Sequence, residues 1–319
     1  HGLDPSGGSL RTKGMAMTPP DDFDPVIGVA ETLEPGLRRI VAPNPSPMTY
    51  RGTNTYLVGE TDIAVIDPGP DSAAHLEAIV AALGPGQTIK HIVVTHSHLD
   101  HSPLSRALSQ RTGAPVYGFG DARAGRSATM QAMAATGYSG GGEGIDAGFT
   151  PVGTVAHGAV ITGSNWRLEV LHTPGHLGNH ICLGLGDACL TADHVMGWAS
   201  SLVSPPDGDL TDFMASCDVL AARDWRVFYP GHGAPVTDPA ARLAWLIRHR
   251  RAREAAVLTA LAEGPASAAT LARTIYTDTP AALLPAATRN VLAHLIDLVG
   301  KSRVTPLGDI AEDTTFSLL

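Results

Sequence analysis

The chain has 319 residues, of which 44% are hydrophobic and 17% are charged, a composition typical of a folded globular protein and not of a disordered one. Its formal net charge of −9, from 22 basic and 31 acidic residues, argues against a dedicated polyanion-binding protein, because clustered Lys and Arg make most phosphate contacts. Only three cysteines occur, and their spacing fits neither a metal site nor a disulfide framework, which favours a reducing compartment.

The N-terminal residues carry no secretion signal, and no apolar run in the sequence comes near the roughly 18 residues needed to span a bilayer. We therefore predict cytoplasmic localisation and no association with a membrane. Residues 1–16, which include HGLDPSGGSLRTKG, resemble a vector-derived tag, and we predict a disordered leader there. The length accommodates one large domain, or a large domain with a small partner.

Short segments rich in β-branched residues predict strands in the first half of the chain, at residues 55–58, 62–67 and 88–96. Apolar residues at helical spacing predict two helices, at residues 72–84 and 103–113. Residues 119–149 are rich in Gly, Ala and Ser and poor in large apolar side chains. This segment is expected to be a flexible lid or a short helix over a site, or else a surface excursion.

Strand signals return in the middle of the chain, at residues 166–172, 180–186, 188–193 and 226–230. A helix is predicted at residues 210–222, before the last of these strands. Strands mixed with helices and with several hairpins predict layered sheets flanked by helices.

The composition becomes mostly helical after Pro239, with helices predicted at residues 243–264, 267–276 and 287–300. In the third helix the apolar residues form one face, which ends at Gly300. The last residues, 303–319, predict a two-stranded wing. We therefore predict one domain at residues 17–239 and a small domain of three helices and a wing at residues 240–319.

Four metal-binding side chains fall within six residues of the stretch THSHLDH, directly after an apolar run: His96, His98, Asp100 and His101. If His96 and His98 lie on the extended end of the strand, they point the same way and reach one metal from one side. The turn into the next helix then places Asp100 and His101 on a neighbouring flank, so two adjacent cations can be held. Imidazole and carboxylate donors suit zinc, with manganese or iron as alternatives.

Three later segments supply matching donors: HTPGHLGNH at 172–180, TADH at 191–194 and YPGHG at 229–233. In the first and the last, Pro-Gly precedes a histidine after a strand, and the glycine permits the tight turn that aims the imidazole at the sheet edge. Asp193 likewise ends an apolar strand. We expect these strand ends to converge on one edge of a sandwich.

The order HxHxDH at residues 96–101, PGH at His176, Asp193 and PGHG at His232 resembles the metallo-β-lactamase superfamily of αββα hydrolases, over residues 36 to 238. GTNTYLVG at 52–59 and IDPG at 66–69 also match. The resemblance implies an α+β fold with a four-layer αββα sandwich. It implies one metal held by His96, His98 and His176, another held by Asp100, His101 and His232, and Asp193 as the bridge.

A closer resemblance is to the β-lactamase-like protein 2 type subgroup, which carries a C-terminal winged-helix domain. GTNTYLVG, HTPGH, DHVMGW and PGHG carry this resemblance. The chain departs from the subgroup at HLGNH, where a small hydroxyl residue and a glycine are more usual, and at SPLSRA, where a Gly-rich turn is usual. The shape of the pocket is therefore not implied by the resemblance.

Two zinc ions a few ångströms apart lower the pKa of a bridging water toward neutrality, so a hydroxide nucleophile needs no side-chain base. The predicted catalytic residues are Asp193, which orients this hydroxide, Asp100, and His194, which follows the bridging aspartate and is expected to touch substrate or a proton. Asp67 is either an acceptor for the N–H of a ligand imidazole or a turn-forming residue before Pro68.

Three functions are compatible with this pattern: a dinuclear-zinc hydrolase of a small ester, thioester, lactone or β-lactam; a metal-dependent endoribonuclease acting on single-stranded RNA; and a winged-helix regulator that binds nucleic acid. The candidate recognition helix carries only Arg289, with Lys301 and Arg303 just beyond it, which disfavours the regulator. Acidity and few aromatics favour a small-molecule substrate over RNA. A helical cap that supports the active site, or a homodimer contact, is the preferred role of residues 240–319.

Overall fold

The computed structural model describes residues 22–139 and 144–319, so the predicted leader at residues 1–16 lies outside the described residues. The first sheet has seven strands in chain order, antiparallel from β1 to β4 and parallel from β4 to β7. Its strands are β1 (Glu31–Glu34), β2 (Leu37–Val41), β3 (Asn54–Val58), β4 (Asp62–Ile66), β5 (Thr88–Val93), β6 (Val116–Gly118) and β7 (Gly153–Thr154).

The second sheet has five strands in the order β12-β11-β10-β9-β8, antiparallel except for the parallel pair β11 and β12. Its strands are β8 (Val160–Thr162), β9 (Arg167–His172), β10 (Ile181–Leu185), β11 (Ala188–Ala192) and β12 (Val227–Pro230). The two sheets pack face to face over a shared core, in which Tyr56 and Ile66 of the first sheet join Leu168 and Leu183 of the second.

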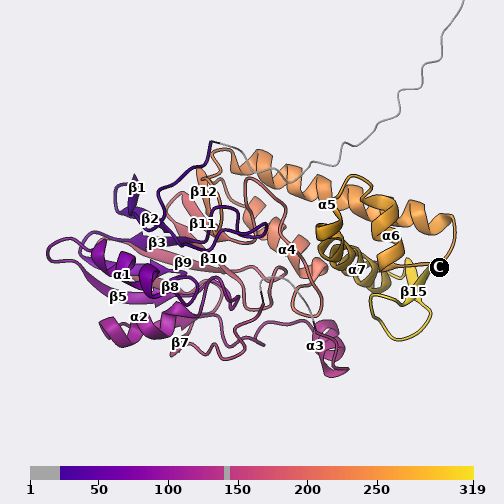
Figure 1. Ribbon diagram of the computed structural model, residues 1–319, viewed down its shortest axis with the longest axis horizontal. Coiled ribbons are helices and arrows are strands. Elements are labelled where there is room, and N and C mark those ends of the chain that lie inside the picture. Colours follow the sequence, from indigo (N-terminus) through magenta and orange to yellow (C-terminus); the bar gives the residue numbers. More distant parts are fainter. Residues whose placement is uncertain (1–21, 140–143) are drawn as a thin grey trace, which may run out of the picture.

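Helices cover the outer face of each sheet (Figure 1). On the first sheet lie α1 (Ala73–Ala81) and α2 (Leu104–Thr112), whose Ile79 and Leu108 pack with Leu57 of β3. On the second lies α4 (Leu210–Ala221), whose Phe213 packs with Phe228 of β12. The layer order is therefore helix, sheet, sheet, helix, which confirms the predicted α+β sandwich.

The strands that sequence patterns miss are short or carry charge. β2 contains Arg39, which breaks the apolar pattern although its side chain is only 4% exposed. Glu31 of β1 pairs with this guanidinium at 2.5 Å, and the ring of Phe23 lies 4.8 Å from it. A buried arginine that is neutralised by a neighbouring strand looks like a surface residue in the sequence.

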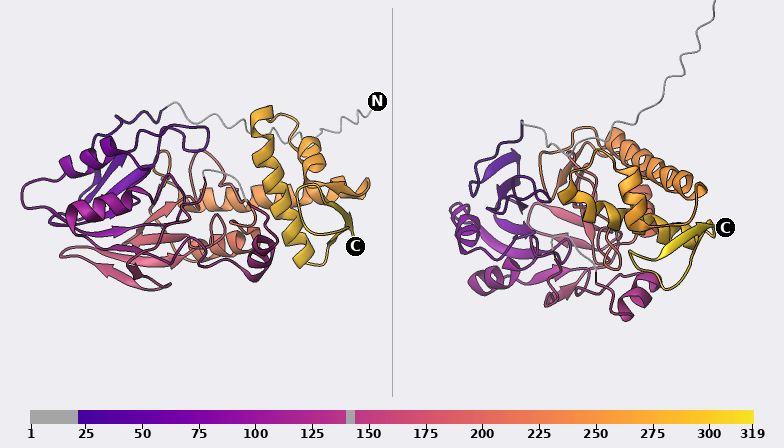
Figure 2. Two further views of the ribbon diagram at one scale, coloured as in Figure 1. Left: turned by 60° about the horizontal axis from the view of Figure 1, so that its bottom comes forward. Right: turned by 45° about the vertical axis from the view of Figure 1, so that its right-hand side comes forward.

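The Gly- and Ala-rich segment 119–149 contains a short helix, α3 (Ala128–Ala135), and a short helix was one of the structures expected there. Ser127 caps its N-terminus by accepting a hydrogen bond from the backbone of Met130. Met130 and Met133 are buried in the core of the C-terminal helices. Helix α3 lies beside these helices, at the opposite end of the molecule from β1 (Figure 1 and Figure 2). The segment is thus docked against the C-terminal part of the chain.

The C-terminal part contains α5 (Pro239–Ala262), α6 (Ala268–Ile275), the 3-10 turn η1 (Ala281–Leu283) and α7 (Leu284–Gly300). Its sheet has the order β13-β15-β14, with β13 (Ala266–Ser267), β14 (Val304–Pro306) and β15 (Thr315–Leu318). Residues 303–319 form the predicted two-stranded wing, β14 and β15, and β13 adds a third strand from outside this range. The third strand was missed because two residues carry no strand pattern.

Helix α5 belongs to both parts of the molecule. It begins at Pro239, four residues before the predicted start, because Asp238 caps it and proline fits its first turn. Leu246 in its first half packs in the core beneath the second sheet, and Val257 in its second half packs in the C-terminal core. The predicted division of the chain at residues 239 and 240 therefore stays a prediction.

Within the described residues, the stretch Ala281–Gly300 is long and apolar enough to cross a membrane by length and composition alone, contrary to the expectation that no such run occurs. Of its most apolar window, 56% is buried inside the structure. Leu292, Leu295 and Leu298 belong to the core shared with α5 and α6. Packing inside the C-terminal domain accounts for the apolar character of this helix.

Candidate metal centre

Four loops meet at one edge of the sandwich, and each follows the end of a strand. They bring together seven side chains, each at most 8% exposed. The loop after β5 supplies His96, His98, Asp100 and His101; the loops after β9, β11 and β12 supply His176, Asp193 and His232. These are the seven residues that the sequence motifs single out.

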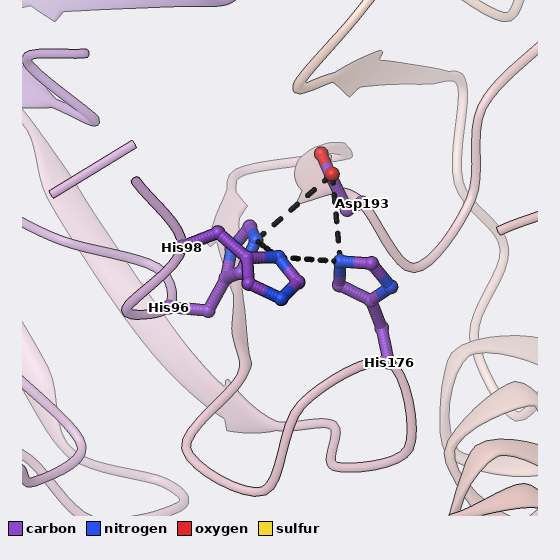
Figure 3. A group of neighbouring side chains, drawn as sticks. All are labelled: His96, His98, His176 and Asp193. Atoms are coloured by element: carbon purple, nitrogen blue, oxygen red, sulfur yellow. Dashed lines mark hydrogen bonds and ion pairs between the residues drawn. The ribbon is translucent and has the colours of Figure 1, made fainter. Parts of the chain in front are cut away.

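The first set of donors consists of His96, His98, His176 and Asp193 (Figure 3). Nδ1 of His98 lies 3.0 Å from Nε2 of His96 and 3.0 Å from Nε2 of His176. The Oδ2 atom of Asp193 lies 3.5 Å from Nε2 of His176 and 3.9 Å from Nε2 of His96. Three ring nitrogens and one carboxylate oxygen thus face a common point.

The second set consists of Asp100, His101, Asp193 and His232. The Nε2 atoms of His101 and His232 are 3.3 Å apart, and each lies 3.1 Å from Oδ2 of Asp100. Asp193 places Oδ1 at 3.4 Å from His101 and Oδ2 at 3.3 Å from His232. Asp193 therefore belongs to both sets and joins them.

The donor spacing fits divalent metal ions. Donors about 2.1 Å from a tetrahedral zinc ion lie roughly 3.4 Å from one another, close to the separations within both sets. Within the described residues the buried Oδ1 atoms of Asp100 and Asp193 have no hydrogen-bond partner, and a carboxylate without donors is costly to bury unless a cation faces it. Nitrogen and oxygen donors in this mixture suit zinc, iron or manganese.

Hydrogen bonds on the far side of each ring fix which nitrogen faces the centre. Four of the histidines present Nε2 to the centre and bond through Nδ1, whereas His98 presents Nδ1. The Nδ1 partners are Thr95 Oγ1 for His96 at 3.0 Å, Asp67 Oδ2 for His101 at 2.9 Å, the Leu202 carbonyl for His176 at 2.7 Å and the Gly52 carbonyl for His232 at 3.2 Å. The carbonyls and the carboxylate can only accept, and the Thr95 hydroxyl already donates to Asp67, so the proton stays on Nδ1 and the Nε2 lone pair is left for a metal.

Asp67 combines the two roles that its sequence context allows. Its backbone φ of 49° fits a turn, and its carboxylate accepts hydrogen bonds from the Thr95 backbone and hydroxyl at 2.7 Å each. The same carboxylate accepts the Nδ1–H of His101, so the predicted contact with a ligand imidazole is confirmed. Thr95 also contacts His96, and Asp67 thereby supports rings of both donor sets.

The two donor sets differ in the direction in which the pKa values of their histidines are shifted. Burial lowers the pKa of His96 well below its ordinary value and that of His98 to about 3, so both rings are neutral donors. Burial also opposes charge on His101, but Asp100 and Asp193 outweigh it and raise its pKa well above the ordinary value. The pKa of His232 rises to about 10 in the same way, against burial and chiefly through Asp193. The two carboxylates therefore attract positive charge to the second set.

His96 and His98 do not lie on the extended end of a strand, so the expectation that strand geometry aligns them is wrong. Strand β5 ends at Val93, so His96 and His98 lie in the loop beyond it and strand alternation does not align them. Their rings converge because the loop turns and because the two rings use different nitrogens. The backbone of Asp146 binds the Ser97 carbonyl at 2.8 Å and holds this turn from outside.

His194, which the sequence places among the catalytic residues, does not reach the seven. Its side chain is fully buried, with its ring 4.3 Å from the ring of Phe213 and Nε2 3.5 Å from Sγ of Cys217. Asp193 and His194 follow the same strand end but face opposite sides, one toward the donors and the other toward α4. The structure therefore gives His194 no contact with the metal centre.

Asn179 supports the centre but was not singled out by sequence reasoning. Its amide nitrogen donates to Ser97 Oγ at 3.0 Å, and its amide oxygen accepts from the Ser97 backbone at 3.4 Å. Ser97 stands between His96 and His98, so Asn179 holds the turn that carries both rings. Asn179 lies within the segment HLGNH that departs from the subgroup pattern, but that departure did not identify this residue.

Two regions of the chain match known protein families. Residues 48–232 match the metallo-beta-lactamase superfamily, and residues 267–312 match the beta-lactamase associated winged helix domain. The Beta-lactamase-like protein 2 homolog of Drosophila melanogaster is 29% identical over 301 residues, which are 89% of this chain and 95% of that protein. The Atrochrysone carboxyl ACP thioesterase of Passalora fulva is 29% identical over 245 residues, which are 75% of this chain and 65% of that protein.

Among solved structures, a metallo-beta-lactamase family protein from Thermus thermophilus superimposes with a TM-score of 0.72 and 26% identity, and covers 90% of this chain and 100% of its own. The match extends beyond the sandwich to the C-terminal helices. The donor residues described above lie within the matched region at the edge where the strand ends meet. The chain belongs to the metallo-beta-lactamase superfamily, as a metal-dependent hydrolase with a C-terminal winged helix domain.

Proposed function

We propose that the protein is a dinuclear-zinc hydrolase that cleaves a small ester or thioester, with a lactone or β-lactam as related substrates. The observation that carries this proposal is the position of Asp193, whose two oxygens lie beside histidines of both donor sets. Two cations shared in this way would supply an activated water and polarise the carbonyl oxygen of the substrate.

The protein's own residues orient these reactants. Burial would raise the pKa of the Asp193 carboxyl, but His232 and His101 outweigh it and hold that pKa well below its ordinary value. Asp193 is therefore a carboxylate, able to orient the attacking water by accepting its hydrogen bond. Thr53 donates to Oδ2 of Asp100 at 3.3 Å and restrains that carboxylate on the other side of the second set.

The substrate approaches from the side of His98 and His176, which are 8% exposed and are the most open members of the cluster. Leu99 follows His98 in the chain and is 46% exposed. Its backbone N–H binds the Gly144 carbonyl at 3.0 Å, which fixes the adjoining segment next to the metal loop. An exposed apolar side chain next to His98 in the chain suits an acyl group more than a phosphodiester chain.

Charge supports a small substrate over a nucleic acid. Arg289, one of the basic residues near the winged-helix recognition position, pairs with Glu312 at 3.6 Å, and Lys301 pairs with Glu254 and Asp297 at 2.8 and 2.7 Å. Ten of the 17 residues of α7 are buried, so this helix presents few side chains to a groove. The thioesterase activity named for the Passalora fulva relative points in the same direction.

The proposal is tested with full-length protein purified without chelator and loaded separately with zinc, iron or manganese. Elemental analysis should give about two metal ions per chain, with zinc the most active form. A panel of a thioester, an ester, a lactone, a β-lactam and single-stranded RNA then identifies the bond that is cleaved. Metal content near zero after loading would overturn the metal centre, and cleavage of RNA alone would replace the acyl substrate by the endoribonuclease alternative.

A further inference from the structure

The loop between β11 and α4, residues 193–209, contributes twice to the metal centre although it contains no helix or strand. It begins with Asp193, which joins the two donor sets. Further along, the carbonyl of Leu202 accepts the Nδ1–H of His176 at 2.7 Å and so sets the tautomer and angle of that ring. Whatever fixes this loop also fixes the His176 donor.

Helix α5 holds the backbone of this loop with two arginines. Arg242 donates from Nε to the Met196 carbonyl and from Nη2 to the Ala199 carbonyl, both at 2.7 Å. Arg250 donates from Nη2 to the Ser201 carbonyl. The two arginines are eight residues apart, which places them on the same face of the helix, about two turns apart.

Helix α7 adds a third support. Oδ1 of Asn290 accepts hydrogen bonds from the Val203 backbone at 3.2 Å and from Nη1 of Arg250 at 3.1 Å. Ser201 and Val203 flank Leu202, so the C-terminal helices bind the loop on both sides of the carbonyl that orients His176. The Ser201 hydroxyl donates back to the carbonyls of Asp193 and His194, which closes the loop on itself.

Arg250 occupies an unusual environment for a charged residue. It is 3% exposed, and within the described residues neither Arg250 nor Arg242 has a carboxylate partner within ion-pair distance. The partners of Arg250 are a carbonyl, an amide oxygen and the ring of Phe213, whose centroid lies 4.9 Å from the guanidinium carbon. Burying a cation without a counter-charge is costly, so Arg250 depends on these contacts to offset the loss of its hydration.

We propose that Arg250 and Asn290 are positioning residues of the metal centre. Through Ser201 and Val203 they hold the Leu202 carbonyl against His176, which makes the C-terminal domain a structural part of the first donor set. The inference rests on the proposed metal centre. It predicts that loss of this support weakens the cation at His96, His98 and His176 and spares the cation at the second set.

The test uses the full-length chain and zinc and cobalt(II) as probes. Asn290→Ala removes the acceptor that both Val203 and Arg250 use, and Arg250→Lys removes the forked donor. Competition with a chromophoric chelator should show a loss of about 10- to 100-fold in affinity at one of two sites. Cobalt(II) spectra of the loaded proteins should change for that site only. Asn290→Asp, which keeps an oxygen at the same place, should restore affinity.

Arg251→Ala is the matched control, because this arginine is exposed on the same helix and has no contact with the loop. It should bind both metals as the parent chain does. Melting of the metal-free proteins separates positioning from stability. Variants that melt lower than the parent but bind metal with parental affinity would overturn the inference while leaving the proposed function intact, whereas a parent chain that binds no metal would overturn both.

Discussion

The carboxylate of Asp67 and the imidazole of His101 form a 2.9 Å hydrogen bond between Oδ2 and Nδ1. The other ring nitrogen, Nε2, lies 3.1 Å from Asp100 and faces the donors of the second set. His101 is thus held between a carboxylate that orients it and carboxylates that share its proposed cation. This pairing increases the electron density at Nε2 and makes the ring a stronger donor.

Asp67→Asn should weaken metal binding at the second donor set by about 10- to 100-fold. The amide keeps the size of the side chain but removes the charge, and its amino group cannot accept the Nδ1–H of His101. Isothermal titration with zinc measures the two affinities. Asp71→Asn, at an exposed aspartate four residues away, is the control. Equal affinities in both variants would mean that Asp67 serves only the turn.

Asp193→Ala should abolish turnover while each donor set keeps its other three side chains. The reaction loses the group that orients the attacking water, so kcat should fall by at least about 100-fold, the lower end of the effect of a positioned acid or base. Circular dichroism during heating shows whether the fold remains. If metal content and cooperative melting disappear together, Asp193 is needed for folding and its part in the reaction stays unproven.

His294→Leu should stabilise the protein, and more so at acidic pH. The imidazole is 1% exposed and neither nitrogen has a hydrogen-bond partner within the described residues, which costs about 1–3 kcal/mol for an unsatisfied group. Burial, then the charge of Arg250, lowers its pKa well below the ordinary value, so the folded form stays neutral.

The unfolded chain protonates this histidine near its ordinary pKa of about 6.5, so stability is lost as the pH falls below that value. Leucine does not titrate, and the gain from His294→Leu should therefore widen between pH 8 and pH 5.5. Urea unfolding at both pH values measures it. His157→Leu, at an exposed imidazole, is the comparison variant. A gain that is the same at both pH values would contradict the assigned cause.

Met130→Ala should release α3 from the C-terminal core. The methionine is 2% exposed, and truncation of a buried methionine costs about 2–5 kcal/mol. We expect limited proteolysis to cut within residues 123–139 faster than in the parent, with the cuts identified by mass spectrometry. Ala132→Ser, on the exposed side of the same helix, provides the comparison. Cleavage spread over the whole chain would show global unfolding and not local release.

The donor residues could be predicted because they lie in short motifs that follow strands. In these motifs a few adjacent residues form the turn and also supply the metal-binding side chain. The support of Leu202 could not be predicted, because Arg242 and Arg250 bind backbone carbonyls 46 and 49 residues away, and a carbonyl has no sequence signature. His194 was misplaced for a related reason. Adjacency to Asp193 in the sequence does not put two side chains on the same side of a strand end.

Strand and helix signals predicted layered sheets flanked by helices, and the family resemblance implied the order of the layers, but the edge strands of the sheets could not be predicted. β13 is too short to show the alternation typical of a strand. β2 contains Arg39, a buried charged residue that pairs with Glu31 and interrupts the apolar pattern. Cytoplasmic localisation, the absence of a membrane contact and a homodimer through residues 240–319 stay predictions. The three buried cysteines are free, as expected from their spacing.

Because synthesis starts at the N-terminus, α3 is made before the C-terminal helices against which it packs. The hydroxyl of Tyr138 binds Glu312 at 3.0 Å, across 174 residues of sequence. At a synthesis rate of about 5–20 residues per second, the partner emerges roughly 9 to 35 seconds after Tyr138 itself. During that interval Met130 and Met133 have no surface to cover them, and a nascent chain that stops early leaves them exposed to chaperones and proteases.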